Sequence, residues 1–227
     1  MEKKKAVKMF RTASALLAVS ALIAAVILLA CTGFAFTDLL RSPAAVTQGA
    51  DMTPEAYVTA DVSFVMDICA VERDGNGEAK AYFAIVPVGD QFVLVRFPAD
   101  DYDHFASLEA ATRSFLRGVS SDMGFHLAVT GMTRQPPNEA AVLLAQWFED
   151  NASWMSQSGV IGAVEDYETY LGAVMIDSGT VGSVSYPSAV AMTLIAALLI
   201  VFAVVEIVFF CAGRYDLPGK GKDKRHV

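Results

Sequence analysis

Residues 188–212 read SAVAMTLIAALLIVFAVVEIVFFCA, and this stretch decides how the rest of the chain is organised. Residues 188–205 carry no charge, and Glu206 is the one charged residue in the run. As an α-helix the stretch would extend about 37 Å, enough to cross a hydrocarbon core of about 30 Å. The sequence therefore predicts a transmembrane helix here.

The composition indicates that only part of the chain lies in a membrane. Of the 227 residues, 54% are hydrophobic and 19% are charged. This mixture is too apolar for an ordinary soluble domain and too charged for a wholly intramembrane protein. A second apolar run, residues 12–36, predicts another transmembrane helix, and residues 37–187 between the two runs have the usual size of one domain.

Basic residues beside the apolar runs predict their orientation. Residues 1–11 hold five basic residues and one acidic residue, and residues 213–227 hold five basic and two acidic residues. Because the cytoplasmic flanks of membrane helices are rich in Lys and Arg, we expect both flanks in the cytoplasm. The expected protein is a multi-pass protein of the cell membrane whose central domain is extracytoplasmic.

The acidity of the chain belongs to the central domain. Residues 37–187 hold 7 basic and 21 acidic residues, a net charge of −14. Nucleic-acid binding depends on clustered Lys and Arg, so no nucleic-acid partner is expected. The charge suits a cationic partner or divalent ions, and it equally fits a solvated acidic surface. The expected partners are the lipid bilayer and either another membrane protein or an envelope component.

The first apolar run has alternative interpretations. The residues before and at Cys31, Leu-Leu-Ala-Cys, resemble a bacterial lipobox, in which the cysteine is lipidated and the preceding segment is removed. Residues 12–30 are longer than the 7 to 15 apolar residues of a signal peptide, and apolar character continues after Cys31. We therefore expect an uncleaved anchor, with lipidation at Cys31 or ordinary cleavage as the alternatives.

Small residues recur at helical spacing in both runs, a pattern that lets two helices approach closely. They are Ser14, Ala18, Ala21 and Ala25 in the first run and Ala189, Thr193, Ala196 and Ala203 in the second. We expect the two helices to pair antiparallel, although Ala is common in any membrane helix.

Glu206 is the candidate functional residue within the membrane, because a carboxylate in hydrocarbon is costly. The structural interpretations are a protonated carboxyl, a hydrogen bond to Ser14 or Ser20, and an approach to the cytoplasmic interface. The functional interpretations are an ion or proton pathway and pairing with a basic residue of a membrane partner. Two helices form a poor pore, so transport would require oligomers or another subunit.

The expected fold class is α+β, with two transmembrane helices flanking one extracytoplasmic domain. That domain is expected to hold an antiparallel sheet of about five strands and two or more helices. After a linker, strands are predicted over residues 58–70, 81–88, 91–98, 125–133 and 170–176, with helices from Asp100 or Asp101 to Gly118 and over residues 138–148. This order matches an OB-like barrel, and a plain sheet with helices on one face fits equally well.

Few side chains in the central domain suggest chemistry. Asp100, Asp101, Asp103 and His104 are close in sequence and could contribute to a metal site, but acids at a helix start also complement the helix dipole. Alternation places Cys69, the single cysteine of this domain, on the polar face of the first strand. The common hydrolase, zinc-protease and nucleotide motifs do not occur, so no catalytic residue, cofactor or enzyme activity is predicted.

The run AYFAIVPVGDQFVLVRFPADDYDHF, residues 81–105, resembles uncharacterised two-pass membrane proteins of bacteria with an extracytoplasmic domain. The resemblance implies a location and no chemistry. Our main hypothesis is a membrane-anchored extracytoplasmic binding or assembly module. The alternative is an accessory subunit of a membrane transporter or channel complex that uses the helices and Glu206.

Overall fold

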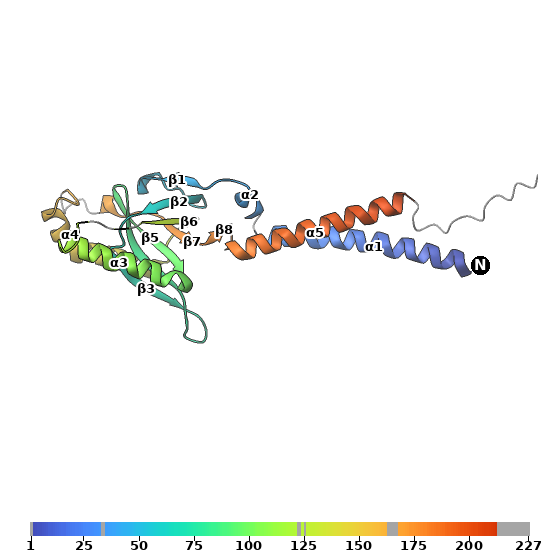
Figure 1. Cartoon of the computed structure of the whole chain (residues 1–227), viewed down its shortest axis with the longest axis horizontal. Helices are drawn as coiled ribbons and strands as arrows, with labels where there is room; N and C mark the ends of the chain where they lie inside the picture. Colours follow the sequence, from blue (N-terminus) through green and yellow to red (C-terminus); the bar gives the residue numbers. More distant parts are fainter. Residues whose placement is uncertain (1, 33–34, 122–123, 125, 163–167, 213–227) are drawn as a thin grey trace, which may run out of the picture. The chain divides into compact units, whose positions relative to one another are not determined.

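The computed structural model describes residues 2–32, 35–121, 124, 126–162 and 168–212. The chain divides into two compact units, one formed by Met1–Thr37 with Pro187–Val227 and the other by Asp38–Tyr186. Figure 1 labels most of their helices and strands. Phe125, which the sequence placed in a strand, and the basic segment 213–227 lie outside the described residues.

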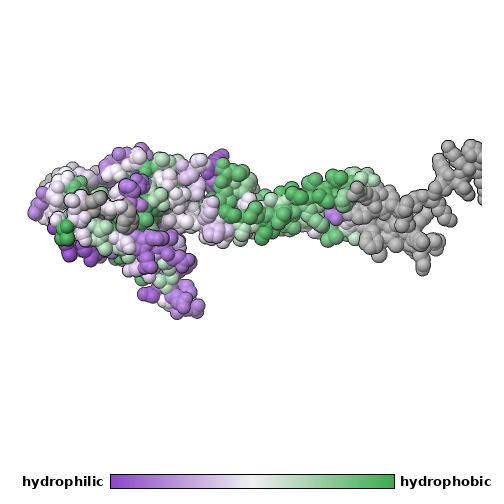
Figure 2. All heavy atoms as spheres, viewed as in Figure 1, coloured by the Kyte–Doolittle hydropathy of each residue, from purple (hydrophilic) through white to green (hydrophobic). Residues whose placement is uncertain are grey.

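Two long apolar helices dominate the first unit. Helix α1 spans Glu2–Cys31 and helix α5 spans Tyr186–Cys211. Mean hydropathy is 2.7 over Thr12–Cys31 and 3.0 over α5, and both segments are long enough to cross a membrane. Figure 2 shows apolar side chains over the outer surface of these helices. A short helix, α2 (Ala35–Leu39), follows α1.

The predicted stripes of small residues are where α1 and α5 meet. Ala18 and Ala21 of α1 form a buried cluster with Ala203 of α5, and Ser14 contacts Glu206. Ser14 precedes Ala18 and Ala21 in α1, whereas its partner Glu206 follows Ala203 in α5. The two helices therefore run antiparallel. The other buried members of the stripes are Ala25, Ala189 and Ala196. The predicted pairing is therefore confirmed within the chain.

The second unit contains a seven-stranded sheet with the strand order β1-β2-β6-β7-β5-β4-β3. Its strands are β1 (Ala44–Val46), β2 (Tyr57–Val62), β3 (Asp67–Arg73), β4 (Ala79–Val88), β5 (Gln91–Pro98), β6 (Leu127–Arg134) and β7 (Met175–Ser178). The pairs β1–β2 and β5–β7 are parallel, and the other neighbours are antiparallel. The expectation of a five-stranded, antiparallel, OB-like sheet is therefore wrong.

Helices α3 and α4 cover opposite faces of this sheet. Helix α3 spans Tyr102–Leu116 and helix α4 spans Asn138–Gln157. The smaller elements are η1 (Gly49–Asp51), η2 (Ala99–Asp101), β8 (Thr180–Val181) and β9 (Val184–Ser185). Phe105 of α3 packs with Phe97 of β5, whereas Phe148 of α4 packs with Leu94 of the same strand. Side chains an odd number of residues apart in a strand point to opposite faces. The expected sheet with helices on one face is therefore wrong too.

The strand predicted over residues 58–70 is two strands at separate places in the sheet. β2 ends at Val62, and β3, which begins at Asp67, forms the far edge. In the connection, the Val65 amide donates to Thr112 Oγ1 at 3.0 Å and the Met66 amide to the Ile85 carbonyl at 2.8 Å. These tertiary hydrogen bonds replace the strand pairing that the alternating pattern predicts.

Other predicted boundaries differ in part from the structure. The hairpin of β4 and β5 with its turn at Gly89 lies where the sequence placed it, and Gly89 has the positive φ of 62° that such a turn uses. Helix α4 continues to Gln157, whereas the predicted helix ends at residue 148. Helix α3 ends at Leu116, two residues before the Gly118 at which the predicted helix ends.

Candidate functional site

The Glu206 carboxylate is bonded within the chain. The hydroxyl of Ser14 donates a hydrogen bond to Glu206 Oε2, which is one of the structural interpretations drawn from the sequence. Ser20, the other candidate hydroxyl, is exposed on α1. A polar contact of this kind between apolar helices favours one register of the pair over others.

The acidic cluster does not form a metal-binding group. Asp100 and Asp101 lie in η2, and Asp103 and His104 lie in the first turn of α3. Within the described residues, no three His, Cys, Asp or Glu side chains are grouped so that they could hold a metal ion. Asp101 is the N-cap residue of α3, although its side chain makes no capping hydrogen bond. The carboxylates therefore complement the helix dipole.

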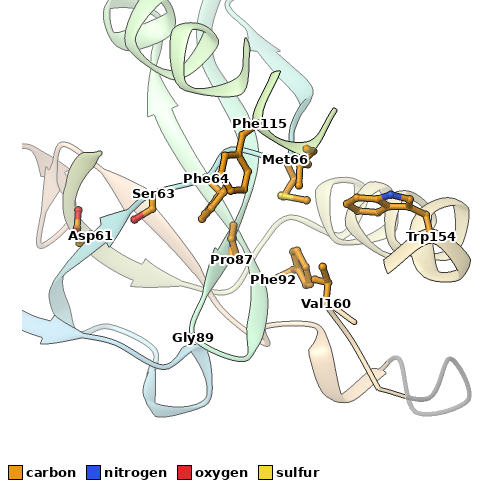
Figure 3. Close-up of a pocket in the computed structure, with 11 residues that line it drawn as sticks. Asp61, Ser63, Phe64, Met66, Pro87, Gly89, Phe92, Phe115, Trp154 and Val160 are labelled. Carbon is orange, nitrogen blue, oxygen red and sulfur yellow. The ribbon is translucent and has the colours of Figure 1, made fainter. Parts of the chain in front are cut away.

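An apolar groove of about 470 Å³ lies in the unit Asp38–Tyr186 (Figure 3). It lies where the connection from β2 to β3 passes the end of α3, the end of α4 and the turn between β4 and β5. Its lining residues are Asp61, Ser63, Phe64, Met66, Pro87, Gly89, Phe92, Phe115, Leu116, Trp154 and Val160. The volume lies within the range of ligand-binding pockets, about 300 to 1,000 Å³.

Aromatic contacts hold the wall of the groove in place. Phe64 and Phe115 meet edge to face, with ring centroids 5.7 Å apart. Phe92 is fixed from behind by Trp147 and Phe148, at centroid distances of 5.7 and 5.5 Å. Such aromatic pairs contribute about 0.5 to 1.5 kcal/mol beyond the area that they bury. Contacts between rings therefore hold this wall, which combines Phe64 of the β2–β3 connection with the core residue Phe92.

The end of α4 positions the opposite rim. Gly159 has a φ of 74° just after the helix, and the Val160 amide donates to the Met155 carbonyl at 2.8 Å. This is the pattern of a Schellman motif, in which a left-handed residue, usually Gly, ends the helix. The motif places Val160 beside Trp154 at the groove. Val160 is 48% exposed and Trp154 40%, so this rim is open to solvent.

The groove has a polar end and an aromatic end. In Figure 3, Asp61 and Ser63 lie at one end and Trp154 at the other, with Phe64, Pro87 and Phe92 between them. None of the described residues that line it is Lys or Arg. The arrangement can bind an apolar group along its length and a cationic group at the Asp61 end.

A row of ion pairs crosses the sheet on the face that α4 covers. Arg96 of β5 bonds Asp177 of β7 at 2.8 Å and Glu72 of β3 at 2.8 Å, and Arg134 of β6 lies 3.1 Å from Asp177. The hydrogen bond from Lys80 holds the pKa of Glu72 below its usual range, with Arg96 adding to the effect. Burial alone would lower the pKa of Arg96, but its two carboxylate partners outweigh burial and raise it. The row therefore joins side chains of β3, β5, β6 and β7 across the sheet.

The chain matches one protein-family model. Residues 3–209, which include most of both apolar helices and all of the unit between them, match the family described as Domain of unknown function (DUF8577). The chain belongs to this family. No curated protein and no solved structure matches it. The family description assigns no activity, so any function has to come from the residues themselves.

The groove was not among the features predicted from the sequence. Its lining residues come from four separate stretches of the chain, and none of these stretches carries a recognisable motif. One feature of the sequence could have indicated it, because Phe64 and Met66 are large apolar residues just beyond the end of β2. Their role depends on the break between β2 and β3, which the uninterrupted alternation of residues 58–70 conceals.

Proposed function

We propose that this chain is a membrane-anchored binding or assembly module, with α1 and α5 in the bilayer and the unit Asp38–Tyr186 outside the cytoplasm of a bacterial cell. The observation that carries the proposal is the open, aromatic-lined groove in a strongly acidic domain. A groove of this kind, with a few polar groups at one end, is typical of a recognition site.

The distribution of apolar side chains supports the membrane part of the proposal. Large side chains of α1 and α5, such as Leu17 and Val201, point outward, whereas small residues such as Ala21 and Ala203 are buried between the helices. A pair of helices in water would bury the large side chains instead. The Lys and Arg residues in segments 1–11 and 213–227 favour a cytoplasmic location for both.

The bond between Ser14 and Glu206 favours the module over an accessory subunit of a transporter or channel. An ion pathway or a contact with a partner's basic residue needs the carboxylate to face that pathway or partner. Here its Oε2 accepts a hydrogen bond from the paired helix. We therefore assign Glu206 a role in holding the two helices together.

Site-specific photocrosslinking in living cells tests the binding role. A photoreactive aromatic amino acid, which keeps a ring at this position, replaces Trp154 in the groove, or Val142 as a control, which is 63% exposed on the same helix, α4. We expect a defined adduct from position 154 that is absent from position 142, and that persists in Glu206→Gln. Equal adducts at both positions would contradict a role for the groove, and loss of the adduct in Glu206→Gln would favour the accessory subunit.

Topology needs a separate experiment. A fluorescent protein fused after Val227 should be fluorescent, as expected in the cytoplasm. Val119 is 80% exposed, so Val119→Cys in a chain without the three native cysteines should react with a membrane-impermeant maleimide on intact cells. Reaction only after the cells are lysed would place the domain in the cytoplasm and reject the proposed orientation.

A further inference from the structure

We propose that the groove binds a peptide segment of a partner protein that presents an aromatic side chain close to a basic one. The aromatic side chain would lie at the Trp154 end, and the basic side chain would pair with Asp61. This inference rests on the proposed binding function and specifies the chemistry of the partner.

Groove residues from both sides provide the aromatic part of the recognition. Phe64, Phe92, Phe115 and Trp154 contribute four aromatic side chains, and Met66 adds a polarisable sulfur. Aromatic rings gain from offset or edge-to-face contact with other rings, and Met sulfur also contacts aromatic rings favourably. An aromatic side chain therefore matches this end of the groove better than an aliphatic chain of similar size.

The charged residues near the groove provide the recognition of the basic side chain. Asp61 is exposed, and within the described part of the chain its carboxylate makes no ion pair or side-chain hydrogen bond. Asp67 and Asp90 directly follow the lining residues Met66 and Gly89, and one cation, Arg117, follows Leu116. The surroundings of the groove are thus acidic, and a cationic group on the partner would be attracted to its Asp61 end.

The cations of the domain cannot neutralise this surface. Residues 37–187 hold only 7 basic residues against 21 acidic ones. Four of those basic residues, Lys80, Arg96, Arg113 and Arg134, are already paired with carboxylates of the domain. The excess negative charge therefore faces outward and selects against acidic partners.

Exposure of the rim indicates a peptide and not an enclosed small molecule. Leu116, Trp154 and Val160 are all at least 40% exposed, so the groove is open along one side. Small-molecule sites usually enclose most of the ligand, whereas an exposed rim of large apolar residues marks a protein interface. Trp, Phe and Met are also the residues enriched at such interfaces.

Fluorescence anisotropy with labelled peptides tests the inference on the full chain in phosphatidylcholine nanodiscs. The probes are capped Gly/Ser peptides with Lys and Phe separated by one to four residues. Their matched controls replace Lys with Glu or Phe with Ala, and empty nanodiscs correct for binding to lipid. We expect the best Lys/Phe peptide to bind at least tenfold more tightly than both controls.

Variants of the groove separate the two contributions. Asp61→Asn should reduce the preference for Lys over Glu by about fivefold, because an exposed ion pair contributes little more than that. Trp154→Ser should weaken both Phe peptides at least tenfold without removing the charge preference. Asp100→Asn and Val142→Ser, which change exposed residues that do not line the groove, should leave binding unchanged.

The outcomes distinguish the inference from the proposed function. Phe peptides that bind through Trp154 with no preference for Lys would overturn the charge pairing and leave the groove as a binding site. No difference between any peptides, together with no specific crosslink at position 154, would overturn both. Crosslinks from position 154 only to a second copy of the chain would replace the partner peptide with self-association.

Discussion

The Ser14 hydroxyl donates a hydrogen bond to the carboxylate of Glu206, which is 192 residues later in the chain. The bond joins α1 to α5 beside the buried contact of Ala18 and Ala21 with Ala203. Apolar packing between helices tolerates sliding along the stripe, but a single polar contact does not. Glu206 therefore has a structural explanation that needs no ion pathway.

Ser14→Ala should weaken the helix pair by about 0.6 kcal/mol, a typical value for a polar contact between membrane helices. Alanine keeps a small side chain in the stripe, so packing is retained while the donor is lost. Titration of the full chain with SDS in mixed micelles measures the change. Ser20→Ala, at an exposed position of the same helix, is the matched control, and an equal effect there would reject the role of the bond.

Ala203→Leu should destabilise the pair by about 1 to 3 kcal/mol, because Ala203 is fully buried against α1 and the larger side chain would push the helices apart. The same SDS titration measures the loss. Val204→Leu changes the neighbouring residue, which is exposed, and should have little effect. Similar stability of the two variants would mean that the small residues do not form the contact.

Arg96→Met should destabilise the domain by about 1 to 3 kcal/mol, because it removes charged hydrogen bonds to Glu72 and the buried Asp177 while Lys80 and Arg134 still pair with these carboxylates. Arg113→Met breaks an ion pair with Glu109 on the surface of α3 and should cost at most about 0.5 kcal/mol. Urea unfolding of both variants in mild detergent, followed by circular dichroism, compares them. Equal costs would show that the row of ion pairs does not stabilise the sheet.

Cys69 should react slowly with alkylating reagents at neutral pH. Burial, with a smaller contribution from Asp67, raises the pKa of its thiol from 9.0 to about 11. Since only the thiolate reacts, the rate of labelling by iodoacetamide should rise about tenfold per pH unit up to pH 10 or above. In a Cys31→Ser, Cys211→Ser variant this rate can be read directly, with circular dichroism to show that the domain stays folded.

A rate that levels off near pH 9 would contradict the raised pKa of Cys69. The matched control is Val119→Cys in a chain without the native cysteines, because position 119 is exposed and its thiol should behave normally. The position of Cys69 also corrects the sequence analysis. Its side chain is partly buried against the core under α4, and its thiol donates to the Phe83 carbonyl at 3.5 Å.

The sequence predicted those features that depend on residues close to one another in the chain. The β4–β5 hairpin follows from alternating apolar residues around Gly89, and the meeting of α1 and α5 follows from small residues at helical spacing. Long apolar runs and tight turns are properties of neighbouring residues. They can therefore be read from a single sequence.

The remaining features depend on residues distant in sequence. β1 has three residues, too few for a clear alternating pattern, and the strand predicted over residues 170–176 shares only Met175 and Ile176 with β7. Both β1 and β7 make parallel pairs. The break between β2 and β3 depends on Thr112, far along the chain. The groove depends in turn on that break, so neither its place nor its lining could be predicted before the fold was known.

The place of β7 in the sheet sets the order in which the domain can be completed during synthesis. Without Met175–Ser178, the earlier strands form two separate groups, β1-β2-β6 and β5-β4-β3. The strand that joins them is made last and ends only a few residues before α5 begins. A chain in which β7 has not yet paired therefore presents an unpaired strand edge on each of the two groups, and such edges favour aggregation.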